Sequence, residues 1–310
     1  MWILDKFKVI NKTICFEELS TEWLEVKKHT IKQSTYYKYA YCIDKYLKKE
    51  FANFKKKDLE RYDYINITNK LTKELSPKSV KEILNILKSI LKYSNQKYDT
   101  NIKVDLIVSP KVHVKEISVF TNKEVKRLEK YCLKKNSLRS LGILICLNTG
   151  LRIGEICALK WKNIDLERRV IHIKKTLQRV YTLEKKTEVI IDRSKTESSI
   201  RDIPMSDKIY NILKKEYNKQ NPENFFLTGK EKKYIEPRNY QNIFKKILRD
   251  SKVKEYNFHV LRHTFATNCI KVGMDIKSLS EILGHSSVDV TLNRYVHSSY
   301  EMKKKYLQKL

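Results

Sequence analysis

The sequence predicts a mainly α-helical fold with a small antiparallel β-sheet, divided into two domains. A chain of 310 residues is long for one ordinary core and suits two domains. Apolar residues recur at helical spacing along most of it, whereas the stretch 169–204 alternates β-branched and polar residues as strands of a sheet do. Hydrophobic residues make up 41% of the chain, which is enough for packed cores and argues against global disorder.

Residues 1–105 are predicted to form a helical domain. The segment CFEELSTEWLEVKKHT has apolar residues at helical spacing, and SPKSVKEILNILKSILKYS begins with Ser76 as N-cap and Pro77 in the first turn. Between them, the segment STYYKYAYCIDKYLKKEF predicts a further helix rich in tyrosine and lysine. Residues 106–120 contain a proline and no helical stripe, so we expect an extended linker there.

Residues 121–310 are predicted to form the second domain. It begins with a helix capped by Thr121 or Asn122, with Glu124 in its first turn. Two helices follow on either side of Thr149 and Gly150, and the strands lie between residues 169 and 204. The remaining segments with helical spacing are SDKIYNILKKEY, PRNYQNIFKKIL, HVLRHTFATNCIKVG, DIKSLSEILGH and VTLNRYV.

The charge of the chain favours a polyanion as partner. The formal net charge is +29, and residues 1–110 carry 22 basic and 14 acidic side chains against 43 and 22 in the remainder. Both domains could therefore contact one nucleic acid, as two jaws of a clamp would. We expect no membrane contact, because the sequence has no long apolar run. We expect a cytoplasmic location, because MWILDKFKVI is a poor signal peptide. The six cysteines form no CxxC pair and are expected to be reduced.

Two segments place arginine at the start of a predicted helix. In TGLRIGEICALKW, Arg152 offers a planar set of donors suited to phosphate beside free backbone N–H groups. Glu155, three residues on, could hold an arginine in place; an ordinary ion pair is the alternative. In HVLRHTFAT, His259 and Arg262 project from one side of the first turn, and His263 is expected to be a hydrogen-bonded structural residue. Zinc is disfavoured, because this pair of histidines lacks an adjacent glutamate and an obvious third ligand.

Three further residues complete a possible phosphate site. Lys195 lies in a turn between predicted strands, although a lysine in a loop is ordinarily solvated surface. His285 ends a predicted helix, and Tyr295 follows ten positions later, although most tyrosines are packing residues. Tyr295 is the only plausible nucleophile of the set.

Attack on a phosphodiester adds negative charge to the non-bridging oxygens, which two guanidinium groups can stabilise. The phenol, with an ordinary pKa of ~10, needs a proton acceptor, for which His259 is a candidate. Lys195 could protonate the leaving sugar oxygen. No cluster of acidic residues suggests a two-metal enzyme, and we expect neither a metal nor another cofactor.

With TGLRIGE, SKT, HVLRH, LGHSS and Tyr295 in this order, the chain resembles the tyrosine recombinases, or phage integrase family. The resemblance implies a two-domain, C-shaped DNA clamp with an N-terminal core-binding domain. It implies that the tyrosine attacks one DNA strand, giving a 3′-phosphotyrosyl bond and a free 5′-hydroxyl without metal or ATP. Carried over, Arg152 and Arg262 bind the scissile phosphate, and Lys195 is the general acid. His259 accepts the proton, His285 donates to a phosphate oxygen, and Tyr295 is the nucleophile.

The resemblance also implies partners. Members act as homo-tetramers on two double-stranded DNA sites through a Holliday junction, in some cases with accessory DNA-bending or directionality proteins. Neighbours exchange a C-terminal segment, for which YEMKKKYLQKL is the candidate; packing of this tail on its own domain is the alternative. Bound to DNA, such a protein would associate with the nucleoid.

Four biological roles remain open from the sequence. The stretch 169–204 resembles the enlarged β-insertion of integrases from conjugative transposons, which usually carry an additional N-terminal arm-binding domain. Few residues precede the helix at Phe16, so we expect no arm-binding domain and favour a mobile-element integrase without one. Xer-like resolution of chromosome or plasmid dimers is the second interpretation. A type IB topoisomerase and a non-enzymatic DNA-binding protein are the remaining alternatives.

Overall fold

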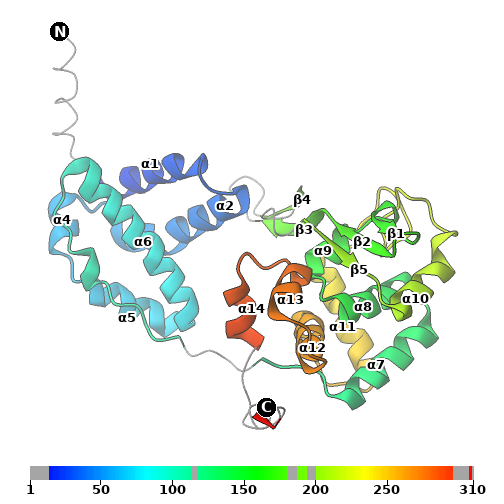
Figure 1. Ribbon diagram of the computed structural model, residues 1–310. Helices are drawn as coiled ribbons and strands as arrows, with labels where there is room; N and C mark the ends of the chain where they lie inside the picture. Colours follow the sequence, from blue (N-terminus) through cyan, green and yellow to red (C-terminus); the bar gives the residue numbers. More distant parts are fainter. Residues whose placement is uncertain (1–13, 113–116, 181–186, 194–199, 296–306, 309–310) are drawn as a thin grey trace. The chain divides into compact units, whose positions relative to one another are not determined.

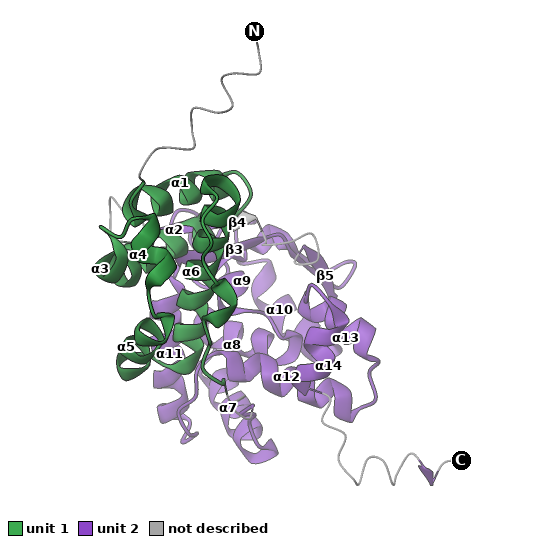
Figure 2. Ribbon diagram, turned by 90° about the vertical axis from the view of Figure 1, so that its left-hand side faces the viewer, with its two compact units in different colours: residues 1–115, 180–188 green, residues 116–179, 189–310 purple. Residues whose placement is uncertain are grey.

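The computed structural model describes residues 14–112, 117–180, 187–193, 200–295 and 307–308. Figure 2 distinguishes two compact units, one of residues 1–115 with 180–188 and the other of residues 116–179 with 189–310. Most described residues are helical, with short strands in between. The predicted fold class, mainly α with a little antiparallel β-structure, is therefore confirmed.

The first unit is built from helices. They are α1 (Phe16–Lys28), α2 (Gln33–Cys42), α3 (Lys48–Phe51), α4 (Lys56–Arg61), α5 (Tyr64–Glu74) and α6 (Pro77–Tyr98). A π-helical turn, Ile43–Leu47, joins α2 to α3, so the helix predicted from the tyrosine-rich segment is a continuous helical run with one irregular turn. Helix α6 begins as predicted, because the Ser76 hydroxyl accepts from the Ser79 backbone N–H at 3.3 Å. Its apolar stripe is buried and contacts α1, α2 and α5.

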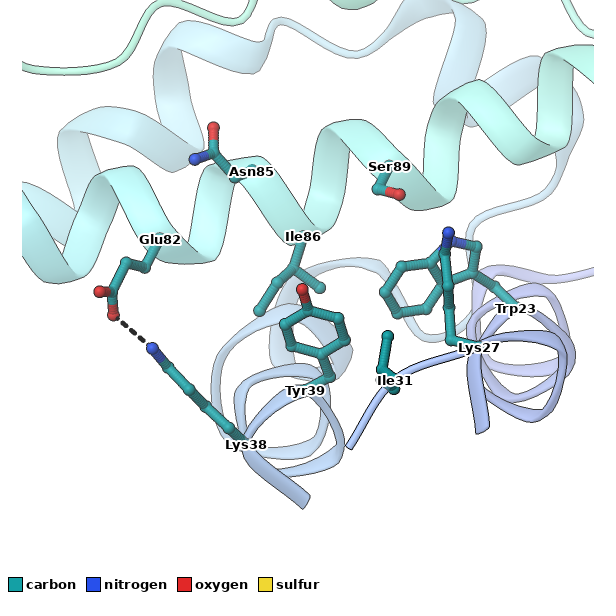
Figure 3. A pocket seen from close by; sticks show the side chains of 9 residues that line it. All are labelled: Trp23, Lys27, Ile31, Lys38, Tyr39, Glu82, Asn85, Ile86 and Ser89. Atoms are coloured by element: carbon teal, nitrogen blue, oxygen red, sulfur yellow. Dashed lines mark hydrogen bonds and ion pairs between the residues drawn. The ribbon is translucent and has the colours of Figure 1, made fainter. Parts of the chain in front are cut away.

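A shallow hollow of about 270 Å³ lies in the first unit, between α1, α2 and α6 (Figure 3). Its wall includes the rings of Trp23 and Tyr39. Of its two lysines, Lys38 forms an ion pair with Glu82 at 2.9 Å and Lys27 lies over the Trp23 ring at 5.9 Å from the centroid. The hollow contains no residue of the phosphate site predicted from the sequence.

The helices of the second unit include one, α8, on which several of the others pack. They are α7 (Asn122–Lys135), α8 (Leu138–Thr149), α9 (Ile153–Ala158), α10 (Asp207–Tyr217), α11 (Pro237–Asp250), α12 (His259–Lys271), α13 (Ile276–Leu283) and α14 (Val288–Tyr295). Thr121 caps α7 as predicted, with its hydroxyl accepting from the Glu124 backbone N–H at 3.3 Å. Helix α12 packs on α8 and also contacts α13 and α14, as Figure 1 shows.

The strands form two small sheets instead of the single one expected. Strands β1 (Ile164–Asp165), β2 (Val170–Ile173) and β5 (Arg201–Pro204) form an antiparallel sheet in the order β1-β2-β5, in which Ile171 lies opposite Ile203. Strands β3 (Lys175–Val180) and β4 (Glu188–Arg193) pair with each other. The buried side chains of the first sheet alternate along β2 and β5, which places Ile171 and Ile203 in the core of the second unit.

The segment predicted as a linker is anchored at both ends. Ile107 is buried in the core of the first unit, and Phe120 is buried in that of the second. The Phe120 backbone N–H also donates to the Thr264 hydroxyl at 3.0 Å. Among the described helices, none is long and apolar enough to cross a lipid bilayer.

Candidate active site

The turn between α8 and α9 places Arg152. Gly150 ends α8 with φ +68°, and a Cβ there would lie 2.7 Å from side-chain carbons of Leu283 and Phe265, so the turn requires glycine. Arg152 then caps α9, and its backbone N–H donates to Glu155 Oε2 at 2.9 Å. Its Nη1 donates to Glu155 Oε1 at 2.8 Å, which confirms that Glu155 holds an arginine in place.

A second arginine, which the sequence reasoning missed, shares this carboxylate. Arg201 Nη1 and Nη2 lie 3.0 and 2.9 Å from the two oxygens of Glu155, and its Nε donates to the Ile282 carbonyl at 2.5 Å. Burial alone would raise the pKa of Glu155, but the charge and hydrogen bonds of Arg201, followed by those of Arg152, lower it to about 2. Alternation along β5 could have revealed Arg201, since it shares a face with the buried Ile203.

The same Arg152 side chain reaches the end of α13. Gly284 caps α13 with φ +65°, and its carbonyl accepts from Arg152 Nη2 at 2.8 Å. A third of the Arg152 side chain remains exposed. The guanidinium is therefore fixed by two elements that are far apart in sequence, and part of it stays open to a ligand.

Arg262 is the most deeply buried cation of the site. Its side chain projects from the first turn of α12, the residue is 1% exposed, and Nη1 donates to the Gly150 carbonyl at 2.9 Å. Its Nη2 makes no hydrogen bond of good geometry to any described residue. Burial, together with the charge of Arg152, lowers the pKa of Arg262 to about 9. A buried guanidinium with an unused donor is suited to bind an anion such as phosphate.

His285 follows Gly284 and points into the same site. Its Nδ1 lies 2.7 Å from the Thr291 hydroxyl on α14, which fixes the ring. Burial and the charges of Arg262 and Arg152 lower the pKa of His285 to about 3, so the ring is neutral near pH 7. The Tyr295 ring lies nearly parallel to it, with centroids 6.4 Å apart.

Tyr295 is the last residue of α14 and is held by a histidine on α12. Its hydroxyl lies 2.8 Å from His263 Nδ1, so the prediction that His263 is hydrogen-bonded is confirmed. Burial raises the pKa of Tyr295, and the nearby charges of Arg262 and Arg294 partly oppose that effect. His259 lies one turn earlier on α12, with its ring centroid 4.6 Å from that of His263, and burial lowers its pKa to about 3.

The structure therefore brings together five of the six residues predicted from the sequence: Arg152, His259, Arg262, His285 and Tyr295. Lys195 lies outside the described residues, as does nearly all of the C-terminal segment 300–310. Of the described residues, His263 and not His259 is hydrogen-bonded to the tyrosine hydroxyl. The assembled site combines two fixed guanidinium groups, neutral imidazoles and a phenol, which is a set that can bind a phosphodiester and attack it.

Comparison with known proteins agrees with this chemistry. Residues 118–302 match the phage integrase family, and residues 15–72 match the N-terminal SAM-like domain of phage integrases. The chain is 30% identical to a "tyrosine recombinase XerC-like" protein of Caldanaerobacter subterraneus subsp. tengcongensis over 308 residues, covering 90% of this chain and 78% of that one. It is 32% identical to the transposase from transposon Tn916 of Enterococcus faecalis over 176 residues, covering 51% of this chain and only 42% of that one.

Solved structures show the same fold. An integrase of transposon Tn1549 in complex with transposon right end DNA superposes with a TM-score of 0.77 at 22% identity, covering 94% of this chain and 99% of that one. A lambda integrase tetramer bound to a Holliday junction superposes with a TM-score of 0.66 at 16% identity, covering 96% and 82%. The extent of the family match, the relative at 30% identity and the arrangement of the site lead to one conclusion. The chain belongs to the phage integrase family of tyrosine recombinases.

Proposed function

We propose that this protein is a site-specific DNA recombinase that breaks and rejoins strands through a 3′-phosphotyrosyl intermediate at Tyr295. The observation that carries the proposal is that one site contains both the tyrosine hydroxyl and the buried Arg262 with an unused donor. A phosphate bound to Arg152 and Arg262 would complete the hydrogen bonds of both guanidinium groups. The same contacts would neutralise the charge that develops on the non-bridging oxygens.

In the proposed cleavage step, the Tyr295 oxygen forms a bond to phosphorus and the bond from phosphorus to the 5′-oxygen breaks. The phenol proton passes to a neutral imidazole of α12, for which the sequence predicts His259. Lys195 gives a proton to the 5′-oxygen, and His285 donates to a non-bridging oxygen through Nε2, since its Nδ1 faces Thr291. In the rejoining step the 5′-hydroxyl of a partner strand displaces the tyrosine, so the bond energy of the phosphodiester is conserved.

The partner in this proposal is double-stranded DNA carrying two recombination sites. The net charge of +29 and the DNA complexes of the structural relatives support it. A tetramer on two sites, aided by DNA-bending or directionality proteins, is the arrangement we propose by analogy with the lambda integrase tetramer. Affinity for duplex DNA should fall steeply between low and moderate salt because counterions are released on binding.

Integration or excision of a mobile element is the role we favour within the family. The match to transposases of Tn916 and the superposition on the Tn1549 integrase support it. Xer-like resolution of chromosome or plasmid dimers is the second candidate, since the "XerC-like" relative aligns over most of this chain.

Covalent capture tests the proposal. The protein is incubated with sheared genomic DNA of its host, adducts resistant to detergent are isolated, and the attached sequences are read. Two copies of a captured site are then placed on one plasmid, and recombinants are scored against relaxed plasmid. We expect recombinants with the wild-type protein and none with Tyr295→Phe, which should still bind DNA. Relaxation without recombinants at any pair of sites would favour a type IB topoisomerase, and binding without adducts would favour a non-enzymatic DNA-binding protein.

A further inference from the structure

The tyrosine hydroxyl has one particular histidine as its hydrogen-bond partner. His263 Nδ1 lies 2.8 Å from the Tyr295 oxygen, within the range of a strong hydrogen bond. The ring centroids of the two residues are 5.5 Å apart and tilted by 57°. From the sequence alone, His263 has no predicted part in the reaction. In the structure it directly follows Arg262 on α12.

The direction of this hydrogen bond follows from the other neighbour of the hydroxyl. The positive charge of the Arg262 guanidinium lies close enough to Tyr295 to favour its phenolate form, so this cation is expected to face the lone pairs of the oxygen and not its hydrogen. A phenol has a single hydrogen. With Arg262 facing the lone pairs of the oxygen, that hydrogen points to His263 Nδ1, and the neutral imidazole must carry its own hydrogen on Nε2.

The surroundings keep His263 ready to accept a proton. Burial, followed by the charges of Arg294 and Arg262, lowers its pKa to about 4, so it is unprotonated near pH 7. The charged and titratable groups around it are Arg262 and His259 on its own helix and Arg294 and Tyr295 on α14. Among the described residues, α8 and α13 contribute no charge that shifts this pKa. A bound phosphate would offset the two arginine charges and make protonation easier at the moment of attack.

We infer that His263 is the base that takes the proton of Tyr295: as the tyrosine oxygen attacks phosphorus, its hydrogen moves to His263 Nδ1. The imidazole becomes an imidazolium, the phosphorus–oxygen bond to the 5′-oxygen breaks, and the leaving oxygen takes its proton from the general acid. In the rejoining step the proton returns from Nδ1 to the tyrosine. This inference rests on the proposed function, and it moves the role predicted for His259 to the histidine that contacts the nucleophile.

The test uses single-turnover formation of the covalent adduct on a captured duplex that is nicked to trap the product, at saturating DNA and over a range of pH. His263→Ala removes the base, and His263→Asn places an amide oxygen near the position of Nδ1, where it can accept the hydrogen bond but not the proton. We expect both variants to be about 10²-fold slower than wild type at pH 7. Their rates should rise about tenfold per pH unit, because the proton must then be lost to solvent, whereas the wild-type rate stays flat above pH 6.

Matched variants make the result specific. His172→Asn changes a histidine of β2 that pairs with Asp202 outside the site, and its pH profile should match that of wild type. His259→Asn should slow the reaction without introducing the rise with pH. If His259→Asn shows that rise and the His263 variants do not, or if His263→Asn restores the wild-type rate and profile, the inference is wrong.

A second measurement needs no DNA and does not depend on the rate. In long-range ¹⁵N–¹H spectra of histidine-labelled protein near pH 7, His263 should show an unprotonated Nδ1 whose signal shifts in Tyr295→Phe. A protonated Nδ1 would contradict the inference even if the variants were poorly folded. Adduct formation by Tyr295→Phe would instead overturn the proposed function. Wild-type kinetics in the His263 variants, with Tyr295→Phe inactive, would overturn this inference alone.

Discussion

The side chains of Arg152 and Arg262 are each held by hydrogen bonds to neighbouring segments of the fold, whereas Tyr295 lies at the end of a short helix. Each arginine donates to the carbonyl of a glycine with positive φ, and Arg152 also shares the buried carboxylate of Glu155 with Arg201. The tyrosine hydroxyl has one hydrogen bond of good geometry to a described residue, with Nδ1 of His263 as its partner. The phosphate-binding side of the site is thus held by hydrogen bonds to several elements of the fold, while the nucleophilic hydroxyl is held by one.

This difference predicts how substitutions will act. Changes on the arginine side should affect folding and catalysis together, because the same groups join α8, α9, α12, α13 and β5. Changes on the tyrosine side should affect catalysis with little effect on stability.

Arg262→Lys should slow adduct formation by about 10²–10³-fold, while DNA affinity falls much less. An ammonium group cannot keep the bond to the Gly150 carbonyl and also offer a flat pair of donors to phosphate. Single-turnover kinetics and a binding titration on the captured duplex measure the two effects. Arg249→Lys, at an exposed arginine paired with Glu255, is the control and should leave the rate unchanged. A wild-type rate in Arg262→Lys would mean that the paired N–H donors of the guanidinium do not stabilise the phosphate during attack.

Lys195→Ala should slow cleavage by about 10²-fold, because the leaving 5′-oxygen then lacks a proton donor. A substrate with sulfur in place of that oxygen should restore the rate, since a thiolate leaves without protonation. Lys174→Ala, at an exposed lysine just before β3, is the control. Failure of the sulfur substrate to restore the rate would remove Lys195 from this role.

Glu155→Gln should lower the free energy of unfolding at pH 7 by an amount on the order of 3 kcal/mol. The pKa of Glu155 is lowered from 4.5 to about 2, so the carboxylate stabilises the folded state fully above about pH 5. That contribution is lost as the pH falls towards 2, and the difference between variant and wild type should shrink over the same range. Urea unfolding at several pH values measures it.

Glu25→Gln provides the matched control for that experiment. Glu25 forms an ion pair with Lys28 in which both side chains are 55% exposed, so solvent screens the pair and its contribution to stability is small. We expect its unfolding to stay close to wild type throughout. An equal loss of stability in both variants would show that the buried ion pairs of Glu155 contribute no more to the free energy of unfolding than an exposed pair does.

The sequence predicted local features well and long-range contacts poorly. Ser76 and Thr121 cap helices as expected, because a cap depends on residues within one turn. Arg201 was missed because its partner Glu155 is 46 residues away, and only the fold brings them together. His263 was expected to be a hydrogen-bonded structural residue, and its hydrogen-bond partner could not be identified because the tyrosine lies 32 residues further on.

The phosphodiester chemistry was predictable for a different reason. Its residues must be arginine, lysine, histidine and tyrosine whatever fold holds them, so their identities and order carry the signal. The two sheets and the shared carboxylate were not predictable, since strand pairing and ion-pair choice depend on packing between distant segments.

The identity of the nucleophile is tested most directly by mapping the DNA-linked residue. Adducts formed on the captured duplex are digested with nuclease and trypsin, and the peptide carrying a nucleotide is sequenced by mass spectrometry. Cleavage after Arg294 and Lys303 releases YVHSSYEMK, so fragmentation separates Tyr295 from Tyr300. We predict the nucleotide on Tyr295 and no modified peptide from Tyr295→Phe. A nucleotide on Tyr300, or on any other of the 19 tyrosines, would contradict the account.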